Sequence, residues 1–213
     1  FAPYLTTLHD CVLAPAPPES LPIDSATVIR NREVQMLPGV CFGKRGEFFC
    51  THVLPRGHIF TVEGQSIPVP QKDIALDVLA LLNTPLVRSS LNKYCGQHKY
   101  SGYVNLFPYR RLSNAEKCRA LVGRAVDALR DAQRYDETQS LFSVVRSGSG
   151  IADDAALIDR LVASAQEACM EAETCCHEGS ISTYRVSKKE RAELDSFRMR
   201  QPQVESPICD IDV

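Results

Sequence analysis

The stretch LPRGHIFTVEGQSIPVP, from Leu54 to Pro70, decides which fold class the chain belongs to. Two short apolar segments, 59–62 (IFTV) and 67–69 (IPV), are separated by 63–66 (EGQS). Short runs rich in β-branched and aromatic residues and bounded by Gly or Pro are typical of strands. Glycine supplies the backbone angles of a tight turn. We therefore expect a β-hairpin with Gly64 in its turn, entered through a basic segment at 56–58 (RGH).

Strand-like segments continue upstream of this stretch, at 26–30 (ATVIR), 40–42 (VCF, after the Pro38-Gly39 turn) and 47–54 (EFFCTHVL). Residues 43–46 (GKRG) lie between the last two segments and predict a glycine-flanked hairpin loop with two cations at its tip. Four prolines in 11–24 predict an extended or loop segment there.

A helix pair follows the strands. Asp73 is the expected N-cap of the first helix, which spans 73–83. Thr84 and Pro85 predict the start of a second helix, with Thr as the cap and Pro at the first helical position, ending by Gly96. The expected apolar faces are Ile74, Val78, Leu81 and Leu82 on the first helix, and Leu86, Val87 and Leu91 on the second.

Two further helices are expected in the C-terminal part. Ser113 and Glu116 have the spacing of a capping box, which predicts a helix that ends near Tyr135. A third helix begins at Asp153 or Asp154. From Ile181 onward the charged sequence has little periodicity, and we expect a loop or linker ordered mainly by a neighbour. The helical faces are Cys118, Leu121, Val122, Val126 and Leu129, then Leu157, Leu161, Val162, Ala165 and Cys169.

These patterns predict an α+β fold, in which a small mixed β-sheet and a helix pair precede a helical C-terminal part. The expected organisation is an α+β domain at 1–112, a helical arm at 113–180 and a partly ordered linker or loop at 181–213. The chain begins with Phe1 rather than Met, so we expect a piece of a longer protein.

The composition, 44% hydrophobic and 23% charged over 213 residues, is typical of a soluble globular protein. The net charge of −2 is unevenly distributed: residues 28–112 hold eleven Lys/Arg and five Asp/Glu, whereas both flanks are acidic. A basic middle favours a polyanionic partner, and chance clustering on a solvated face is the alternative. The apolar runs are too short to span a membrane, and no secretory segment is visible, so we expect no membrane association.

The chain contains nine cysteines without a CxxC pair, which favours free thiols in a cytoplasmic protein over a disulfide framework. The run Cys175-Cys176-His177 has metal-binding residue types, but a second ligand pair is missing at zinc-site spacing. Motifs for dinucleotides, nucleotide phosphates, zinc hydrolysis or a nucleophilic serine are absent from the sequence. We therefore predict no catalytic residues, no metal ligands and no cofactor within this segment.

The residues suited to binding are those of a nucleic-acid interface. Arginines and lysines contact phosphates, whereas His, Tyr and Asn in a loop can stack on bases or read their edges. Burial of the tyrosines in the core is the structural alternative. The predicted DNA-binding residues are Arg30, Arg32, Lys44, Arg45, Arg56, His58, His98, Lys99, Tyr100, Tyr103, Arg110 and Arg111.

Three segments in order, LPRGHIFTVEGQSI (54–67), LALLNTPLVRSSL (79–91) and HKYSGYVNLFPY (98–109), resemble the target-recognition domains of bacterial DNA adenine methyltransferases. The nearest similarity is to the large methyltransferases of the BREX and DISARM phage-defence systems, and type I specificity subunits share a looser version. FAPY (1–4), RN (30–31) and PG (38–39) follow the same order. The resemblance covers about residues 1–145, and 146–213 look like a family-variable insertion.

This resemblance implies a DNA target-recognition part of a site-specific adenine-N6 methyltransferase, with double-stranded DNA and a catalytic methyltransferase domain as partners. Other defence-system subunits are further possible partners, and S-adenosylmethionine is the implied cofactor of the parent enzyme. Lys44 and Arg45 would grip the DNA backbone or enter a groove, Arg56 and His58 would face the duplex, and three residues would lie nearest the bases: Lys99, Tyr100 and Tyr103.

Two other functions remain open from the sequence. The first is a non-catalytic DNA specificity or adaptor subunit, which docks a separate methyltransferase or nuclease through its helices. The second is a hydrolase or metal enzyme that uses Cys175, Cys176 and His177.

Overall fold

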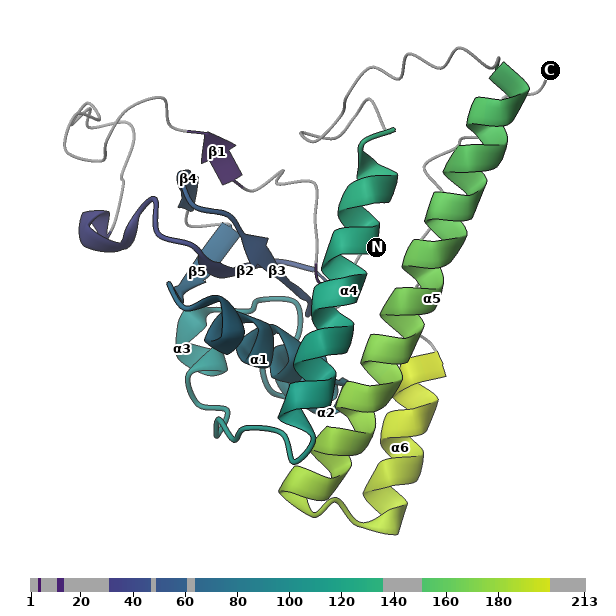
Figure 1. Ribbon diagram of the computed structural model, residues 1–213. Helices are drawn as coiled ribbons and strands as arrows, with labels where there is room; N and C mark the ends of the chain where they lie inside the picture. Colours follow the sequence, from purple (N-terminus) through teal and green to yellow (C-terminus); the bar gives the residue numbers. More distant parts are fainter. Residues whose placement is uncertain are drawn as a thin grey trace.

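The computed structural model describes residues 4, 11–13, 31–46, 49–60, 64–135 and 151–199. Its α+β class agrees with the prediction. A three-stranded antiparallel sheet has the order β3 (Thr51–Leu54), β2 (Gly39–Gly43), β5 (Gly64–Pro68). A second pair joins β1 (Cys11–Leu13) to β4 (His58–Phe60), and a short 3-10 helix spans Arg32–Val34. The helices form the other side of the molecule, with α4 and the long α5 side by side (Figure 1).

The expected hairpin within 54–70 is wrong. Its first strand, β4, pairs with β1, and its second strand, β5, pairs with β2, so the two do not pair with each other. Gly64 lies in β5 opposite Gly43 and makes no turn. The expected strand pair around the 43–46 loop is confirmed, because β2 and β3 are antiparallel partners. The sheet is antiparallel rather than mixed. Local composition predicted the strands, whereas residues distant in sequence determined their partners.

Gly39 shows how close β2 and β5 lie. A Cβ atom at this position would be 2.2 Å from the carbonyl oxygen of Ile67, so only glycine fits without a backbone shift. Val40 opposite Ile67 adds the apolar cross-strand contact. The predicted strand 26–30 lies outside the described residues, and the expected loop over 11–24 begins with strand β1.

The junction of α1 (Lys72–Leu82) and α2 (Pro85–Cys95) fastens the helix pair to the sheet edge. The Asn83 amide donates to the Thr51 carbonyl and accepts from the Thr51 N–H, both at 2.9 Å, and so pairs with β3 as a neighbouring strand would. Thr84 caps α2 as predicted, since its hydroxyl accepts from the N–H of Val87. The buried Arg88 donates from Nε to the Phe49 carbonyl at 2.8 Å.

Two details of α1 differ from the prediction. Its N-cap is Gln71, so Asp73 lies within the first turn, where a carboxylate still favours the helix dipole. Ile74 is 47% exposed rather than buried. Leu81 and Leu82 are buried as predicted, and Asp77, Leu79 and Ala80 are buried with them, so the buried residues lie in the C-terminal half of the helix while its first turn is exposed.

Helix α4 (Ala115–Gln133) buries every apolar residue that the sequence predicted for its face. The expected capping box is wrong: Asn114 is the N-cap and makes no side-chain capping bond, while the Ser113 N–H donates to Thr183 Oγ1 at 2.8 Å. Helix α5 spans Ile151–Tyr184 and packs against α4. One hydrophobic core runs from β2 through α1, α2 and α4 to α5, so it continues across residue 112.

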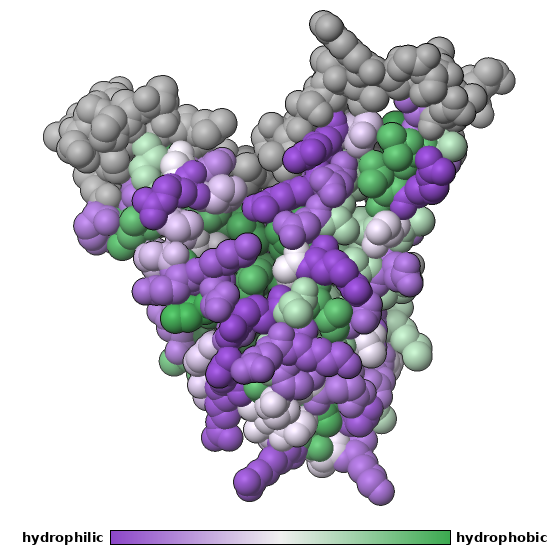
Figure 2. Space-filling view, viewed as in Figure 1, coloured by the Kyte–Doolittle hydropathy of each residue, from purple (hydrophilic) through white to green (hydrophobic). Residues whose placement is uncertain are grey.

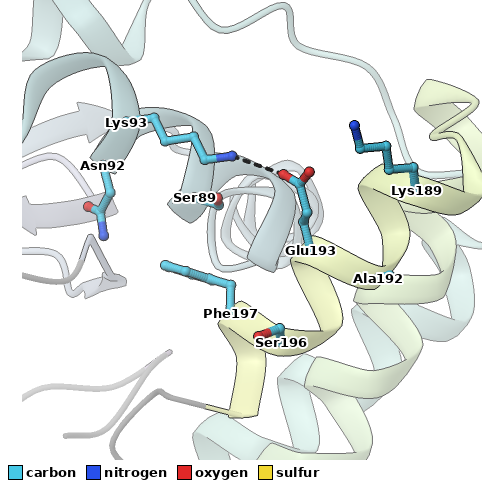
Figure 3. A pocket seen from close by; sticks show the side chains of 8 residues that line it. All are labelled: Ser89, Asn92, Lys93, Lys189, Ala192, Glu193, Ser196 and Phe197. Atoms are coloured by element: carbon cyan, nitrogen blue, oxygen red, sulfur yellow. Dashed lines mark hydrogen bonds and ion pairs between the residues drawn. The ribbon is translucent and has the colours of Figure 1, made fainter.

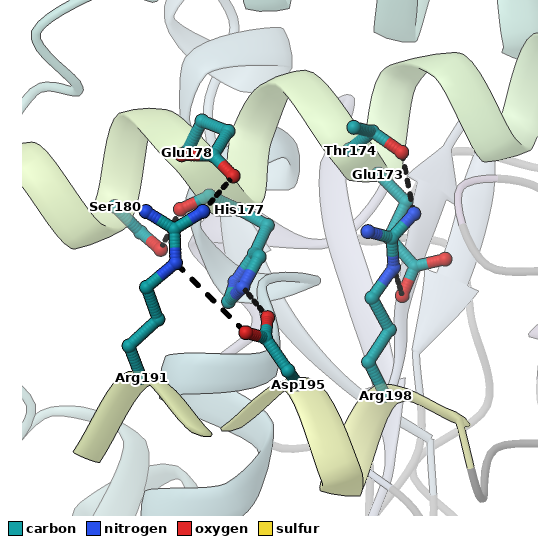
Figure 4. A network of polar contacts seen from close by, with 8 residues as sticks. All are labelled: Glu173, Thr174, His177, Glu178, Ser180, Arg191, Asp195 and Arg198. Carbon is teal, nitrogen blue, oxygen red and sulfur yellow. Dashed lines mark hydrogen bonds and ion pairs between the residues drawn. The ribbon is translucent and has the colours of Figure 1, made fainter. Parts of the chain in front are cut away.

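The expected linker from Ile181 is wrong over most of its described length. Helix α5 continues to Tyr184, and 188–199 form α6 (Lys188–Met199), which folds back along α5. His177 Nε2 meets Asp195 Oδ1 at 2.8 Å, Arg191 meets Glu178 at 2.5 Å, and Arg198 lies 3.7 Å from Glu173 (Figure 4). Apolar periodicity is weak over α6 because Leu194 is its single buried residue.

In the described residues, no single helix combines the length and apolar composition needed to cross a membrane. The bent pair α1 and α2, which meet at 64°, passes that test only when the two are taken together. Polar side chains cover most of the lower part of the face in Figure 2, and apolar side chains show between them in separate patches.

Candidate nucleic-acid interface

The candidate site lies at the Gly43 end of β2, where two loops are joined backbone to backbone. The loop after β2 carries Lys44 and Arg45, and the loop after α2 carries 96–100. Arg45 and His98 form an isolated antiparallel bridge. The Gly46 N–H donates to Gln97 O at 3.2 Å, and the Lys99 N–H donates to Lys44 O at 2.7 Å. Residues that are more than fifty positions apart in the sequence are thereby fixed side by side.

Lys99 holds these loops together and does not face outward. Its side chain is 1% exposed, and Nζ donates to the carbonyl oxygens of Gly46, at 2.7 Å, and Gly96. The expected position of Lys99 near the bases is therefore wrong in this structure. A lysine in a surface loop is ordinarily solvated, whereas this one donates to the backbone of both loops.

Four rings form a row on the surface beside these loops, which we call the ring row: His98, Tyr100, Tyr103 and Tyr94. His98 is exposed and stacks on Tyr100 with centroids 6.3 Å apart. Tyr100 meets Tyr103 edge to face at 5.9 Å, and Tyr103 meets Tyr94 at 5.5 Å. The three tyrosines are 44%, 36% and 66% exposed, in the same order. Rings in mutual contact that remain this exposed present faces on which a base can stack.

Two rings of the ring row belong to the start of α3 (Ser101–Val104), which is hydrogen-bonded to the sheet. Tyr100 is the residue that precedes α3, and Tyr103 lies within it. The Ser101 N–H donates to Gln65 Oε1 at 2.6 Å, which fixes the start of α3 to β5. These anchors hold Tyr100 and Tyr103 in place before any ligand arrives.

Positive charge accompanies the ring row. Lys44 Nζ lies 5.1 Å from the centroid of the Tyr100 ring, a cation–π contact, and the residue is only 9% exposed. Arg45, next along the loop, is exposed. The arrangement therefore offers one exposed guanidinium for a phosphate, beside stacking surfaces for bases.

The other predicted binding residues do not join this group. Arg56 and His58 lie beyond the opposite end of β2, near Gly39, and His58 is largely buried with Nδ1 3.2 Å from Pro55 O. Arg30 lies outside the described residues, as does the side chain of Arg32.

Arg110 lies near the C-terminal end of α5, and Arg111 lies between α1 and α4. The Arg110 guanidinium lies over the Tyr184 ring at 5.8 Å, and Arg111 pairs with Asp77 at 3.3 Å. Asp77 also pairs with Arg119 at 2.8 Å. Part of the basic middle that the sequence predicted is therefore neutralised or buried, since Arg88 and Lys99 are also inside.

Tyr94 belongs to the ring row, yet sequence reasoning missed it. It follows Val87 by seven residues and Leu91 by three, and this spacing predicts a place on the buried face of α2. The side chain is instead 66% exposed and contacts the ring of Tyr103. The sequence offers no signal that would have distinguished this tyrosine from a core residue.

A groove of ≈ 650 Å³ lies between α2 and α6, lined by Ser89, Asn92, Lys93, Lys189, Ala192, Glu193, Ser196 and Phe197 (Figure 3). Lys93 pairs with Glu193 at 3.4 Å across it, and the Phe197 ring extends toward α2. The groove is lined by polar side chains from both helices together with Phe197 and Ala192.

Within the described ranges, the structure brings together no group of three His, Cys, Asp or Glu side chains that could hold a metal ion, and this applies to the run Cys175-Cys176-His177 as well. His177 is buried and directed toward Asp195 on α6. Comparison with known proteins adds no assignment, because no family model matches the chain and no curated protein matches it significantly.

Proposed function

We propose that this chain is the DNA target-recognition part of a cytoplasmic, site-specific DNA adenine-N6 methyltransferase in bacterial phage defence. One observation carries the proposal: the exposed ring row lies beside the cationic loop of Lys44 and Arg45. Base faces are apolar and polarisable, whereas the backbone is anionic, so rings and cations together match nucleic acid better than they match a protein or a neutral ligand.

The sequence resemblance supports the narrower part of this proposal, namely duplex DNA and adenine methylation. Methyl transfer would take place in a separate catalytic domain that binds S-adenosylmethionine, in the same or another chain. A non-catalytic specificity or adaptor subunit would use the same surface. The two are separated by whether the intact gene product methylates adenine by itself.

Duplex binding across a salt series tests the proposal. A fluorescently labelled duplex that carries one unpaired adenine, whose base is free to stack on a ring, is titrated with the chain, and anisotropy gives the Kd at each salt concentration. Tyr100→Ala removes one stacking surface, worth about 1–3 kcal/mol or roughly 5- to 150-fold in Kd. Tyr109→Ala is the matched control, because Tyr109 is 54% exposed and lies outside the ring row.

Arg45→Ala tests the phosphate contact. The slope of log K against log salt should fall by about 0.9 if Arg45 neutralises one phosphate. Arg160→Ala, an exposed arginine on α5, should leave the slope unchanged. Equal effects of Tyr100→Ala and Tyr109→Ala, or no binding at low salt, would rule out the ring row as the DNA-binding surface.

A further inference from the structure

A pair of thiols lies where α4 meets α5, away from the ring row. Cys118 on α4 and Cys175 on α5 have their Sγ atoms 3.6 Å apart. Asn114 holds both: its Nδ2 donates to Cys175 O at 3.0 Å and its Oδ1 accepts from Cys118 Sγ at 3.2 Å. The two sulfurs are thus in contact, with side chains that the surrounding helices already orient toward each other.

The two thiols differ in access. Cys118 is fully buried, whereas Cys175 is partly exposed and lines a surface groove of ≈ 570 Å³ between α4 and α5. Lys117, which is exposed, lines the same groove. A small reagent can therefore reach Cys175 from solvent, whereas it cannot reach the buried Cys118 directly.

We propose that Cys118 and Cys175 are a modification site: a reversible disulfide that crosslinks α4 to α5, formed by low-molecular-weight disulfides. An S–S bond requires the two sulfurs to approach from 3.6 Å to about 2.05 Å. Such reversible disulfides are the kind found in reducing compartments.

The reaction has two exchange steps. Cys175 attacks a sulfur of the disulfide RSSR; the S–S bond of RSSR breaks, RSH leaves with the Cys175 proton, and a Cys175–S–SR mixed disulfide remains. Cys118 then attacks the Cys175 sulfur and expels the second RSH, which takes the Cys118 proton. The two protein thiols are oxidised by two electrons, and RSSR is reduced to two RSH.

The ionisation of the pair determines which of the two steps is slow. Hydrogen bonds from Cys176 and Cys175 lower the pKa of Cys118 to about 7 despite its burial, and Lys117 helps. Burial, together with the hydrogen bond and charge of Cys118, raises the pKa of Cys175 to about 11. Cys118 is thus the readier thiolate of the reduced pair at neutral pH, and the attack by Cys175 is the slow step, which accelerates as pH rises toward the pKa of Cys175.

Cys176 is the competing partner of Cys118. Cys176 is only 1% exposed, however. Cys169 is a second buried thiol on α5, and burial raises its pKa to about 12. A reagent entering from the groove meets neither of them first. The crosslink is therefore expected at Cys175.

Oxidised glutathione, added to the full chain, tests the proposal. Peptide mapping by mass spectrometry should find a 118–175 crosslink and no lasting glutathione on the wild-type chain. Closing a loop of 57 residues should raise Tm by about 10 °C, reversibly with dithiothreitol. Cys118→Ser should trap glutathione on Cys175, and Cys175→Ser should leave Cys118 unmodified.

Cys95→Ser is the matched control. Cys95 is also partly exposed, but its Sγ donates to Leu91 O, and its removal should not change the crosslink. Stable glutathionylation of Cys175 in the wild-type chain, or a crosslink mapped to any other pair, would overturn the proposal.

Discussion

Replacing Lys99 with methionine distinguishes the sequence-based role of this residue from the one in the structure. Its ammonium donates to the Gly46 and Gly96 carbonyls inside the junction of the two loops. Methionine keeps the length of the apolar stem and removes both donors. If the two hydrogen bonds of Lys99 hold this junction together, the variant loses stability. If Lys99 is a DNA contact, the variant loses only DNA binding.

The magnitude follows from the two hydrogen bonds. Bonds made by a charged group contribute about 1.5–3 kcal/mol each, and the variant loses the two that Nζ donates. Removing a buried charge offsets part of this cost. We expect the free energy of unfolding to fall by about 3 kcal/mol, which lowers Tm by roughly 6–12 °C for a chain of this size.

Urea denaturation followed by circular dichroism measures this change, and a thermal scan gives Tm. Lys93→Met is the control, because the Lys93 side chain is 72% exposed and its pair with Glu193 lies on the surface. We expect the control to change stability by at most about 0.5 kcal/mol. Wild-type stability of Lys99→Met, combined with weaker DNA binding and a shallower salt slope, would refute the structural role of Lys99 in the junction.

Three further predictions concern other parts of the fold. Asn83→Ala should lower the free energy of unfolding by about 3 kcal/mol in urea titrations, because both backbone groups of Thr51 lose a buried partner; a change below about 1 kcal/mol would contradict this. Gly179→Ala should destabilise by about 1–2 kcal/mol despite the better helix propensity of alanine, since the new Cβ would overlap the Asn114 amide; a rise in Tm would show that Asn114 moves aside without cost. Cys118 in the reduced chain should ionise as pH rises through about 7, because hydrogen bonds from Cys176 and Cys175 lower its pKa; an ultraviolet thiolate absorbance that is absent from Cys118→Ser and rises only well above pH 9 would contradict that pKa.

The sequence determined those features of this protein that depend on neighbouring residues. Thr84 followed by Pro85 predicted where α2 begins, because capping and proline geometry act within one turn. The spacing of Cys118, Leu121, Val122, Val126 and Leu129 predicted the buried face of α4, since helical periodicity is a local property. The α+β class followed from the same kind of pattern. Residue type alone named five residues of the candidate site in advance: Lys44, Arg45, His98, Tyr100 and Tyr103.

Only the tertiary structure decided which segments meet. β4 and β5 are separated by three residues, yet each pairs with a strand outside the stretch 54–70, because strand pairing depends on contacts across the whole chain. Lys99 is inside and Tyr94 is outside for the same reason: burial depends on what the rest of the molecule places next to a side chain. The contact between Cys118 and Cys175, 57 positions apart, likewise exists only because α4 and α5 lie side by side.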